Sequence, residues 1–378
     1  MTITLLDTVT FGTGSASINI TGLSTGGISG VPGGYVCTDT RSTAASIIDG
    51  RDISRAIPLY QANINEFNTY ANTTEGLTRH YKLTEDVTLP TVLPGESNWE
   101  AIGTFPTAQF TGSFDGQNHT ISNLTTYASG NSQGMFGRIN GDGITRGIVK
   151  NVGLISGSIN GNDFVGGVVG LNNGTVENCY STGDMSGDRI VGGIAGWNIG
   201  TVVNCYSTGD VIGSNDNVGG VVGLNIGTVE NCYSTGDVSG FGRVGGVVGD
   251  NGGTVENCVA LNQAITSTSG GYLEFGRVVG FNNGSFGAGN HARSNMKFID
   301  GPTSTPFTPS PPVISDLNGI HGEDVVVGAS VALDSVFSAG RGWDPAVWDV
   351  PTGVNFDVGG VLPTLNNMPA GVQDPRIQ

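Results

Sequence analysis

The sequence predicts an all-β protein that folds as a parallel β-helix, a solenoid with one coil per repeat. Three observations support this fold class. A unit containing "NCYSTGD" or a close variant returns at near-constant spacing, glycine pairs interrupt every unit, and valine, threonine, isoleucine and tyrosine dominate the rest. Glycine pairs are unfavourable in a helix, and the remaining residue types favour strands. Repeats of roughly 20 to 50 residues are typical of solenoids, whose units bury their apolar side only against their neighbours.

The length and composition agree with one elongated repeat domain, although the length also fits two or three ordinary domains. The chain has 378 residues, including 64 glycines, and 37% of the residues are apolar, which is enough for a core. Its net charge is -17, with 15 basic against 32 acidic residues and no basic cluster. Binding to nucleic acid or to an anionic membrane surface is therefore disfavoured. No window approaches the roughly 18 apolar residues of a membrane span, so no membrane insertion is expected.

Residues 1–60 are rich in threonine and glycine and lack the repeat, so we assign them to attachment or assembly. The N-terminus has neither the basic region nor the apolar stretch of a secretory signal peptide. The chain is then expected to stay inside the cell, to leave by another route, or to be carried on a particle such as a virion. Cys37 lies in this segment, and its neighbours Tyr35 and Val36 favour a buried thiol over one available to another subunit.

The β-helix is expected over residues 61–300 and is clearest over 164–262. A short amphipathic helix should precede it, because Ile64, Phe67 and Ala71 have helical spacing. An open coil would expose the edges of its sheets. This helix is therefore expected to cap the first coil.

The one-residue variation in repeat length falls between the "TGD" aspartate and the valine of the next "VGG". Segments that tolerate a change in length are typically exposed turns. We therefore expect the turns at 186–189, 213–217 and 240–243 to emerge along one edge of the solenoid. The constant parts, "TVENCYSTG" and "VGGVVG", should be short strands separated by Asn-Gly turns.

The end of the chain differs from the repeats. Residues 301–312, "GPTSTPFTPSPP", have the composition of a proline-rich linker. They separate the coils from residues 313–378, which are rich in strand-forming residue types. We expect this β-rich C-terminal piece to fold back as a cap.

The segment "VGGVVGLNNGTVENCYSTGD" closely resembles the GLUG-motif repeat of large bacterial surface and adhesin-like proteins. Upstream, "HYKLTEDVTLP", "NWEAIGT" and "FTGSFDGQNHTISNLTT" resemble the segments that precede the repeats in such proteins. Downstream, "GRGWDPAVWDV" followed by "LPTLNN" is similar to their ends. The resemblance covers residues 62–365 in pieces. It implies a right-handed β-helix and display on a surface, but no particular ligand.

Asparagines recur in two series that should stack along the axis of the solenoid. Stacked asparagines can hydrogen-bond to one another, as they do in cross-β ladders, so both series are expected to be structural. The first series comprises Asn123, Asn151, Asn178, Asn204, Asn231, Asn257 and Asn290. The second series comprises Asn172, Asn198, Asn225, Asn251 and Asn282.

The repeat cysteines should form an inward-facing row with spacings of 26, 27 and 26 residues. Neighbouring coils lie about 4.8 Å apart, so disulfides are possible on distance alone. The preceding coil, however, has Val152 at this position, which indicates a site for a small hydrophobic side chain. A zinc site is disfavoured, because one row of a single ligand type cannot form a tetrahedron. We therefore expect buried, unbonded thiols at Cys179, Cys205, Cys232 and Cys258.

Tyr180, Tyr206 and Tyr233 follow the cysteines and should point to the surface, because side chains alternate along a strand. Val259 ends this row. We expect the tyrosines to stack on one another between coils. The alternative is that they form a platform for sugar rings.

Asp184, Asp210 and Asp237 should form a row of carboxylates, in which like charges are destabilising unless they are offset. A bound calcium ion would offset them, since calcium prefers oxygen ligands. No calcium-loop motif occurs, however, and splaying of the carboxylates into water is a sufficient alternative. We expect no other metal and no cofactor.

These patterns predict a non-catalytic structural or adhesive protein, displayed outside a cell or on a virus particle. The repeat faces carry threonine, serine, asparagine and valine, and they lack the cluster of carboxylates and basic residues found in β-helix lyases and hydrolases. Fold alone does not indicate an enzyme. The expected partner is a surface glycan or a protein receptor, and a homo-oligomer or larger assembly is expected. The alternatives are a carbohydrate-active enzyme, such as a phage depolymerase, and a subunit of a self-assembling extracellular filament.

Overall fold

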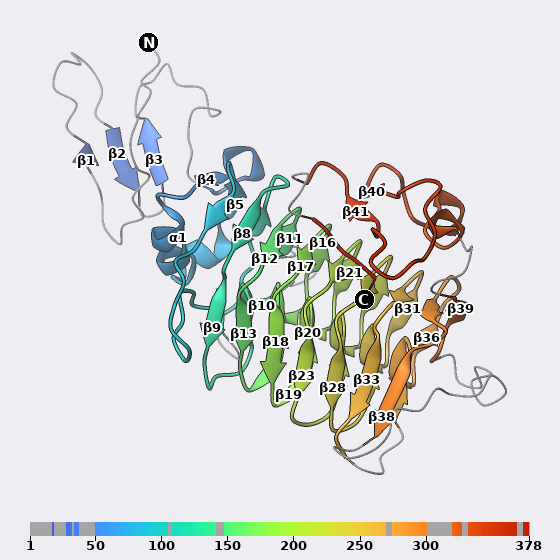
Figure 1. The fold of residues 1–378 in the computed structure, drawn as a ribbon. Coiled ribbons are helices and arrows are strands. Elements are labelled where there is room, and N and C mark those ends of the chain that lie inside the picture. The colour runs from blue at the N-terminus through green and yellow to red at the C-terminus, as the bar shows by residue number, and fades with distance from the viewer. Residues whose placement is uncertain are drawn as a thin grey trace.

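The computed structural model shows a parallel β-helix whose coils stack from the N-terminal to the C-terminal end of the repeats (Figure 1). It describes residues 17–18, 28–31, 34–37, 50–104, 108–140, 147–269, 274–300, 320–326, 332–368 and 373–377. The side chain of Cys37 and the proline-rich segment 301–312 lie outside the described residues. The predictions about them therefore remain predictions.

Each complete coil passes through five short parallel strands, which belong to five different sheets. We number the sheets I to V in the order in which a coil visits them. Sheet I contains β14 (Asp163–Gly166), β19 (Arg189–Gly192), β24 (Val218–Gly219), β29 (Val244–Gly245) and β34 (Phe275–Gly276). Sheet II contains β10 (Phe136–Ile139), β15 (Val169–Asn172), β20 (Ala195–Asn198), β25 (Val222–Asn225), β30 (Val248–Asn251) and β35 (Val279–Asn282).

The next two sheets are longer. Sheet III contains β4 (Ile57–Leu59), β5 (His80–Leu83), β7 (Ser113–Asp115), β11 (Ile148–Lys150), β16 (Thr175–Glu177), β21 (Thr201–Val203), β26 (Thr228–Glu230), β31 (Thr254–Glu256) and β36 (Ser285–Phe286). Sheet IV contains β6 (Val87–Thr88), β8 (Thr120–Ser122), β12 (Gly153–Ile155), β17 (Tyr180–Ser181), β22 (Tyr206–Ser207), β27 (Tyr233–Ser234), β32 (Val259–Ala260), β37 (His291–Arg293) and β39 (Glu323–Val325).

The remaining elements are sheet V and a few short pieces. Sheet V contains β9 (Thr125–Tyr127), β13 (Ser158–Asn160), β18 (Asp184–Gly187), β23 (Val211–Gly213), β28 (Val238–Gly240), β33 (Ala264–Ser267) and β38 (Lys297–Asp300). Antiparallel pairing joins β1 (Ser17–Ile18), β2 (Ile28–Val31) and β3 (Gly34–Cys37), and also β40 (Trp348–Asp349) and β41 (Thr364–Leu365). The helices are α1 (Ile64–Ala71) and the 3-10 helices Ile53–Arg55, Gly76–Thr78, Leu333–Ser335 and Ala339–Arg341.

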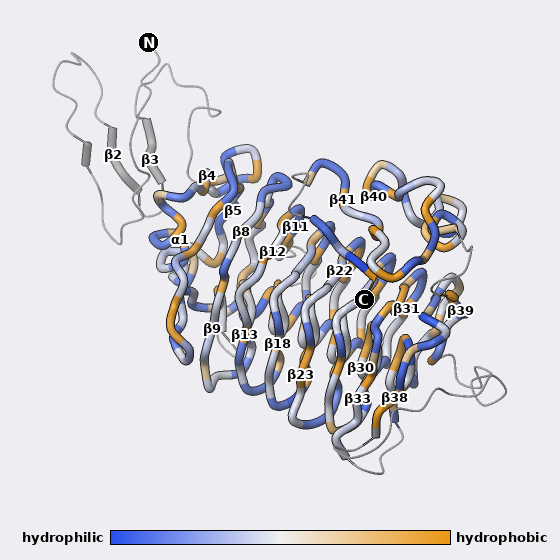
Figure 2. Tube along the Cα trace, viewed as in Figure 1, coloured by the Kyte–Doolittle hydropathy of each residue, from blue (hydrophilic) through white to orange (hydrophobic). Residues whose placement is uncertain are grey.

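The core is a set of rows in which each inward side chain lies over its equivalent in the next coil. Val176 pairs with Val202, and Val229 pairs with Val255, so valine repeats on the inner side of sheet III. All of these valines are fully buried. Hydrophobic and hydrophilic stretches accordingly alternate round each coil in Figure 2. The predicted fold class is therefore confirmed: short β-type segments build a solenoid with one coil per repeat.

The predicted capping helix is also present. Helix α1 closes the N-terminal end of the solenoid (Figure 1), with Ile64, Phe67 and Ala71 at most 1% exposed. The Phe67 ring packs edge-on against Tyr81 of β5, with their centroids 4.8 Å apart. It also lies 5.9 Å from the ring of Phe114. The helix thus covers apolar side chains that would otherwise face solvent.

The solenoid extends beyond the predicted limits of 61 and 300 at both ends. Strand β4 already pairs in parallel with β5, so the first coil begins before residue 61. At the other end, β39 pairs with β37 after the proline-rich segment. The carbonyl of Ile320 accepts hydrogen bonds from the backbone N–H groups of Val278 and Val279, both at 3.0 Å. Residues 320–325 therefore complete the last coil and do not belong to the cap, which the sequence predicts to begin at residue 313.

One asparagine row lies inside the turns that follow sheet II, and we call it the inner asparagine row. Asn198 donates from Nδ2 to Oδ1 of Asn225 at 2.8 Å, and Asn225 donates in the same way to Asn251 at 2.8 Å. Asn172 precedes this chain and Asn282 ends it. Asn198, Asn225 and Asn251 are all 0% exposed. This row therefore satisfies buried amide groups that would otherwise be costly to bury.

The other asparagine row lies at the corner between sheets III and IV, and we call it the outer asparagine row. Its members have φ between 52° and 67°, a left-handed conformation that asparagine tolerates better than most residues. The amides of Asn178, Asn204 and Asn231 each donate to the preceding asparagine of the row, for example from Asn204 to Asn178 at 3.1 Å. This direction is opposite to that of the inner row. The members are Asn118, Asn151, Asn178, Asn204, Asn231 and Asn257.

Two of the seven asparagines assigned to this row do not belong to it. Ser122 pairs with Ile155, which places Asn123 opposite Ser156 at the next corner of the coil. Its place in the outer row is taken by Asn118. Val259 pairs with His291, so Asn290 lies at the cysteine position and Gly289, with φ of 74°, replaces the asparagine. Both errors fall where the spacing departs from the clear repeat, and counting residues could not fix the register there.

The cysteine and inner asparagine rows should respond differently to substitution. Cys205→Val should shift the free energy of unfolding by less than about 1.5 kcal/mol, because Val152 fills the same site one coil before Cys179. Asn225→Ala should cost about 2 kcal/mol or more, because it leaves buried groups of both neighbours without partners. Denaturant unfolding monitored by circular dichroism measures both values. An equal cost for the two variants would contradict the ladder.

Candidate functional site

The tyrosines of sheet IV form a continuous stack along the outside of three coils. The ring centroids of Tyr180 and Tyr206 are 4.9 Å apart with an interplanar angle of 4°, and those of Tyr206 and Tyr233 are 4.9 Å apart at 3°. The rings point away from the solenoid core, as strand alternation predicts. They are nevertheless 0% exposed, so the expectation of a surface stripe is wrong.

The reason is the C-terminal segment, which folds back over sheet IV (Figure 1). We call residues 332–368 and 373–377 the C-terminal cap. Trp348 lies 5.9 Å from Tyr233 and 6.4 Å from Tyr206 between ring centroids, and Phe337 packs edge-on to Tyr233 at 5.9 Å. The tyrosines, the cap aromatics and several aliphatic side chains form a second hydrophobic core, separate from that inside the coils. The tyrosine row is therefore a docking face that the chain itself occupies.

Polar contacts fix the cap in one position. The Tyr233 hydroxyl donates to the carbonyl oxygen of Pro363 at 2.6 Å, and that of Tyr206 donates to Oε1 of Gln373 at 3.1 Å. Burial raises the pKa of both phenols well above the ordinary value, so they remain neutral donors. The Tyr180 hydroxyl is buried and has no hydrogen-bond partner among the described residues. Its pKa is also raised, mainly by burial.

The tyrosine row is limited at its N-terminal end by a glycine. Gly153 pairs with Tyr180 from the preceding coil. A side chain at Gly153 would place its Cβ 2.3 Å from the Tyr180 ring, closer than non-bonded atoms approach. Tyr180 therefore lies over bare backbone, and Val259 continues the buried face at the other end.

An ionic contact joins the far end of the cap to the last coils. Arg341 Nη1 lies 2.7 Å from Nε2 of His291, and 3.6 Å from Oε2 of Glu323. Since guanidinium can only donate, this geometry requires the imidazole nitrogen to be an unprotonated acceptor. Burial lowers the pKa of His291 below its ordinary value of 6.5; Glu323 opposes this shift and Arg341 adds to it. This contact of the cap therefore requires a neutral histidine.

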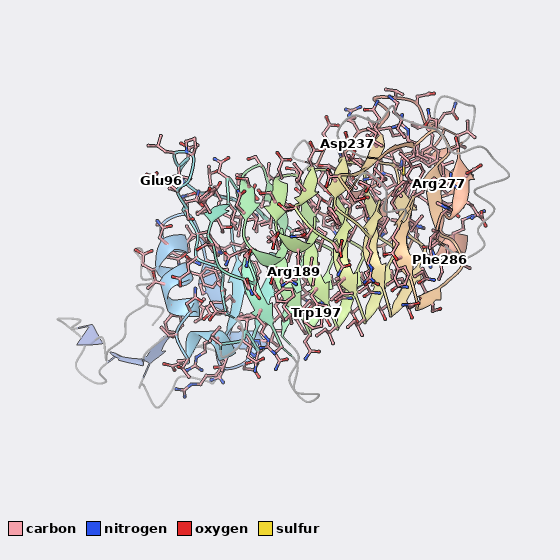
Figure 3. The ribbon with its side chains drawn as sticks, turned by 90° about the horizontal axis from the view of Figure 1, so that it is seen from below. Glu96, Arg189, Trp197, Asp237, Arg277 and Phe286 are labelled. Carbon is pink, nitrogen blue, oxygen red and sulfur yellow. The ribbon has the colours of Figure 1, made fainter. Side chains whose placement is uncertain are left out.

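The carboxylates of the aspartate row accept backbone hydrogen bonds from the next coil. Oδ1 of Asp184 accepts the backbone N–H of Asp210 at 2.9 Å, and Oδ1 of Asp210 accepts that of Asp237 at 2.9 Å. Asp237, labelled in Figure 3, accepts in turn from the backbone N–H of Ala264 at 3.0 Å. Burial, and to a smaller extent Asp210, raises the pKa of Asp237, while the Ala264 hydrogen bond lowers it. The described residues contain no cluster of three or more histidine, cysteine or acidic side chains that could hold a metal.

The cysteine row lies inside the coils. Cys179, Cys205, Cys232 and Cys258 are each 0% exposed and unbonded. Each thiol donates to the carbonyl oxygen two residues earlier, for example from Cys205 Sγ to Val203 at 3.2 Å. Burial raises the pKa of the Cys205 and Cys258 thiols, which keeps them protonated. This row is a structural feature of the core, because neither solvent nor a ligand reaches it.

The length-variable turns form a contiguous strip between sheets V and I. The backbone N–H of Asn215 donates to the carbonyl oxygen of Asp188 at 2.7 Å, and the N–H of Phe241 donates to that of Asn215 at 3.1 Å. Phe241 within this strip is 42% exposed, and Ile212, which directly precedes the strip at residue 213, is 52% exposed. We call residues 186–189, 213–217 and 240–243 the turn strip. It combines acidic, amide and exposed apolar side chains along one edge.

The described residues give little evidence for a catalytic site. His80 Nδ1 lies 2.7 Å from Oγ of Ser113, a contact that resembles a nucleophile and its base. Ser113 is only 4% exposed, however, and no described carboxylate lies within 4.0 Å of the His80 ring. The pair is explained as a link between β5 and β7, which are neighbours in sheet III.

No helix among the described residues is long and apolar enough to cross a membrane.

The His291 contact predicts a pH dependence of cap stability. The unfolded chain binds this proton near pH 6.5, and the folded chain binds it only at lower pH. The stability that neutral His291 contributes is therefore complete above pH 6.5 and is lost as the pH falls through the lowered folded pKa. Urea unfolding monitored by tryptophan fluorescence should show this loss in the native protein.

The variant His291→Gln, which keeps an acceptor but does not titrate, should reduce the pH dependence of that transition. His80 also has a pKa lowered by burial, and it lies far along the chain from the cap. His80→Gln is therefore the matched control. If His80→Gln removes the pH dependence of cap fluorescence and His291→Gln leaves it intact, the contact is not the sensor.

Comparison with known proteins supports the repeat assignment. Residues 165–186, 187–212 and 214–239 match the GLUG motif. The chain is 32% identical over 203 residues to halomucin of Haloquadratum walsbyi (strain DSM 16790 / HBSQ001). This match covers 46% of the chain and 2% of halomucin, so the chain spans a very small part of that relative.

A solved structure shares the fold. It is the crystal structure of a candidate immunoglobulin A1 protease from Bacteroides ovatus, with a TM-score of 0.61 and 21% identity. The superposition covers 84% of this chain and 94% of that chain. At this identity the likeness concerns the fold alone. Together with the three motif matches and the stacked coils, it shows that the chain contains GLUG-motif repeats and folds as a β-helix.

Proposed function

We propose that the protein is a non-catalytic structural or adhesive β-helix protein that is displayed on an extracellular surface and contacts its partner through the turn strip. The observation that supports this function is that the turns vary in length while the strands of each coil keep a fixed register. Val191 pairs with Val218, and Val218 with Val244, so the strands keep their register across turns of different length. A rigid scaffold with tolerant loops is a common arrangement for binding residues.

The surfaces away from the strip favour binding over catalysis. The aspartate carboxylates accept backbone hydrogen bonds from the next coil, and the tyrosine row is covered by the cap. A glycosidase needs two carboxylates placed for acid and base or nucleophile roles. Asp184 and Asp210 instead each stabilise the backbone of the following coil. The extracellular setting is supported by the likeness to the relative named halomucin.

The strip can be tested with matched surface variants. Ile212→Ser and Phe241→Ser, together, should reduce retention of the protein on immobilised surface polysaccharides and glycoproteins at least several-fold. Ile226→Ser is the control, because Ile226 is 51% exposed, like Ile212, but lies at the corner after sheet II. Equal retention of both variants would show that the strip is not the contact surface. Release of reducing ends or unsaturated sugars by the native protein would instead support the carbohydrate-active enzyme.

The N-terminal segment provides a second test. Residues 1–49 precede the first described coil, and we propose that they attach the protein to its carrier or to other copies. Deleting them should abolish incorporation into the parent surface or assembly, while circular dichroism of the purified variant stays β-rich. Normal incorporation of the truncated chain would move the attachment role to another part of the protein.

A further inference from the structure

A cavity of about 210 Å³ opens where the C-terminal cap ends along the outer asparagine row. From the solenoid, its wall consists of Asn118, Asn151 and Asn178, which are neighbours in three successive coils. From the cap, it receives the side chains of Asn366 and Asn367. Among the described residues, every polar side chain that lines the cavity is therefore a primary amide, and none carries a charge.

The asparagines of the solenoid wall are held in place but keep free hydrogen-bonding capacity. Asn151 donates from Nδ2 to Oδ1 of Asp115 at 3.0 Å and accepts from Nδ2 of Asn178 at 3.0 Å. Asn178 accepts in turn from Asn204 at 3.1 Å. A primary amide has two donor hydrogens and two acceptor lone pairs. Each of these ladder bonds uses one donor or one acceptor, so Asn151 and Asn178 each retain one donor and one acceptor.

Two further amides of the cavity are unused. Among the described residues, the side chains of Asn118 and Asn367 make no hydrogen bond with the protein. Both residues have left-handed backbone, with φ of 67° and 65°. Asn366, by contrast, is fixed, since its Nδ2 donates to the carbonyl oxygen of Pro345 at 2.7 Å. The cavity thus combines positioned amides with two amides that have no partner.

Elsewhere in the outer asparagine row, the cap lies directly against the amides. Further along, Trp348 Nε1 donates to Oδ1 of Asn204 at 3.3 Å. Gly342 lies so close to Asn257 that a Cβ would be 2.6 Å from its Nδ2. The cap therefore covers Asn204 and Asn257, and it leaves the row open at Asn118, Asn151 and Asn178.

The remaining lining is apolar and comes from the cap. Val347, Leu365 and Met368, with Ala346, form this side of the cavity. Its volume lies below the roughly 300 Å³ at which pockets for drug-sized ligands begin. The cavity therefore suits one ring and not an extended chain. An apolar surface opposite several donor–acceptor pairs matches a pyranose, whose C–H face is apolar and whose hydroxyl groups both donate and accept.

We propose that this cavity binds a neutral hexose unit, such as the terminal residue of a glycan. The amides would contact adjacent hydroxyl groups, and the side chains of Val347 and Met368 would contact the apolar face of the ring. The described part of the lining has no cationic side chain, which disfavours phosphate and uronic acids. This site is separate from the turn strip, which lies at another corner of the coils, so the inference does not depend on the proposed function.

Titration of the full-length protein with methyl glycosides of glucose, galactose and mannose tests the site by calorimetry and ligand-detected NMR. At least one should bind, and galacturonate should bind at least tenfold more weakly. Asn118→Gly and Asn367→Gly remove an amide while keeping the left-handed backbone that glycine adopts readily. Each should weaken binding about five- to tenfold, because one or two hydrogen bonds are lost.

Asn217→Gly is the matched control, since Asn217 has φ of 67° but lies in the turn strip. It should bind the sugar as the native protein does. The proposal is overturned if none of the three glycosides binds, if galacturonate binds equally well, or if the two cavity variants retain native affinity. Weaker turn-strip binding in the Ile212→Ser and Phe241→Ser variant, with sugar affinity unchanged, would show that the two sites are independent.

Discussion

Parallel pairing in strict register from one coil to the next is the constraint on which this structure depends. Because Thr175 pairs with Thr201 and Tyr180 pairs with Tyr206, each residue lies over a copy of itself. Each position of the repeat must then carry a side chain that can lie against an identical side chain in the next coil, at the distance between neighbouring strands. Valine does so by packing, asparagine by amide hydrogen bonds and tyrosine by ring stacking. Aspartate does so only because each carboxylate accepts a backbone N–H of the next coil.

This constraint explains which features could be predicted from the sequence. The fold class, the capping helix and the inner asparagine row can each be predicted from residue spacing. In a solenoid, the spacing between repeats determines which residues pair in successive coils. The errors at Asn123 and Asn290 lie outside the regular repeats, where an inserted or deleted residue changes the register without changing the residue type. The amide cavity was also missed, since it needs both Asn178 and Asn367, which are far apart in the sequence.

The burial of the tyrosine row could not be predicted for a related reason. Strand alternation determines that Tyr206 points out of the coil, but not what lies on it. The covering residues, such as Trp348, come more than one hundred residues later and have no repeat pattern of their own. A row of identical rings is a flat apolar surface, and in an isolated solenoid it would be left in water. The cap removes this surface at the cost of ordering one non-repetitive segment, and where the cap ends the asparagine row becomes accessible.

The covered ends bear on how copies of the protein could assemble. An uncapped β-helix can add further coils through its open sheet edges. Here Phe67 of α1 fills the N-terminal opening, and the C-terminal coil is completed by β39, where Arg277 is held by Asp324. A filament built by stacking onto the N-terminal end would have to displace α1. Association through the long side of the solenoid, or through residues before the first coil, leaves the core undisturbed. We therefore propose lateral or N-terminal attachment for any assembly, with the turn strip and the amide cavity on different corners of the coils.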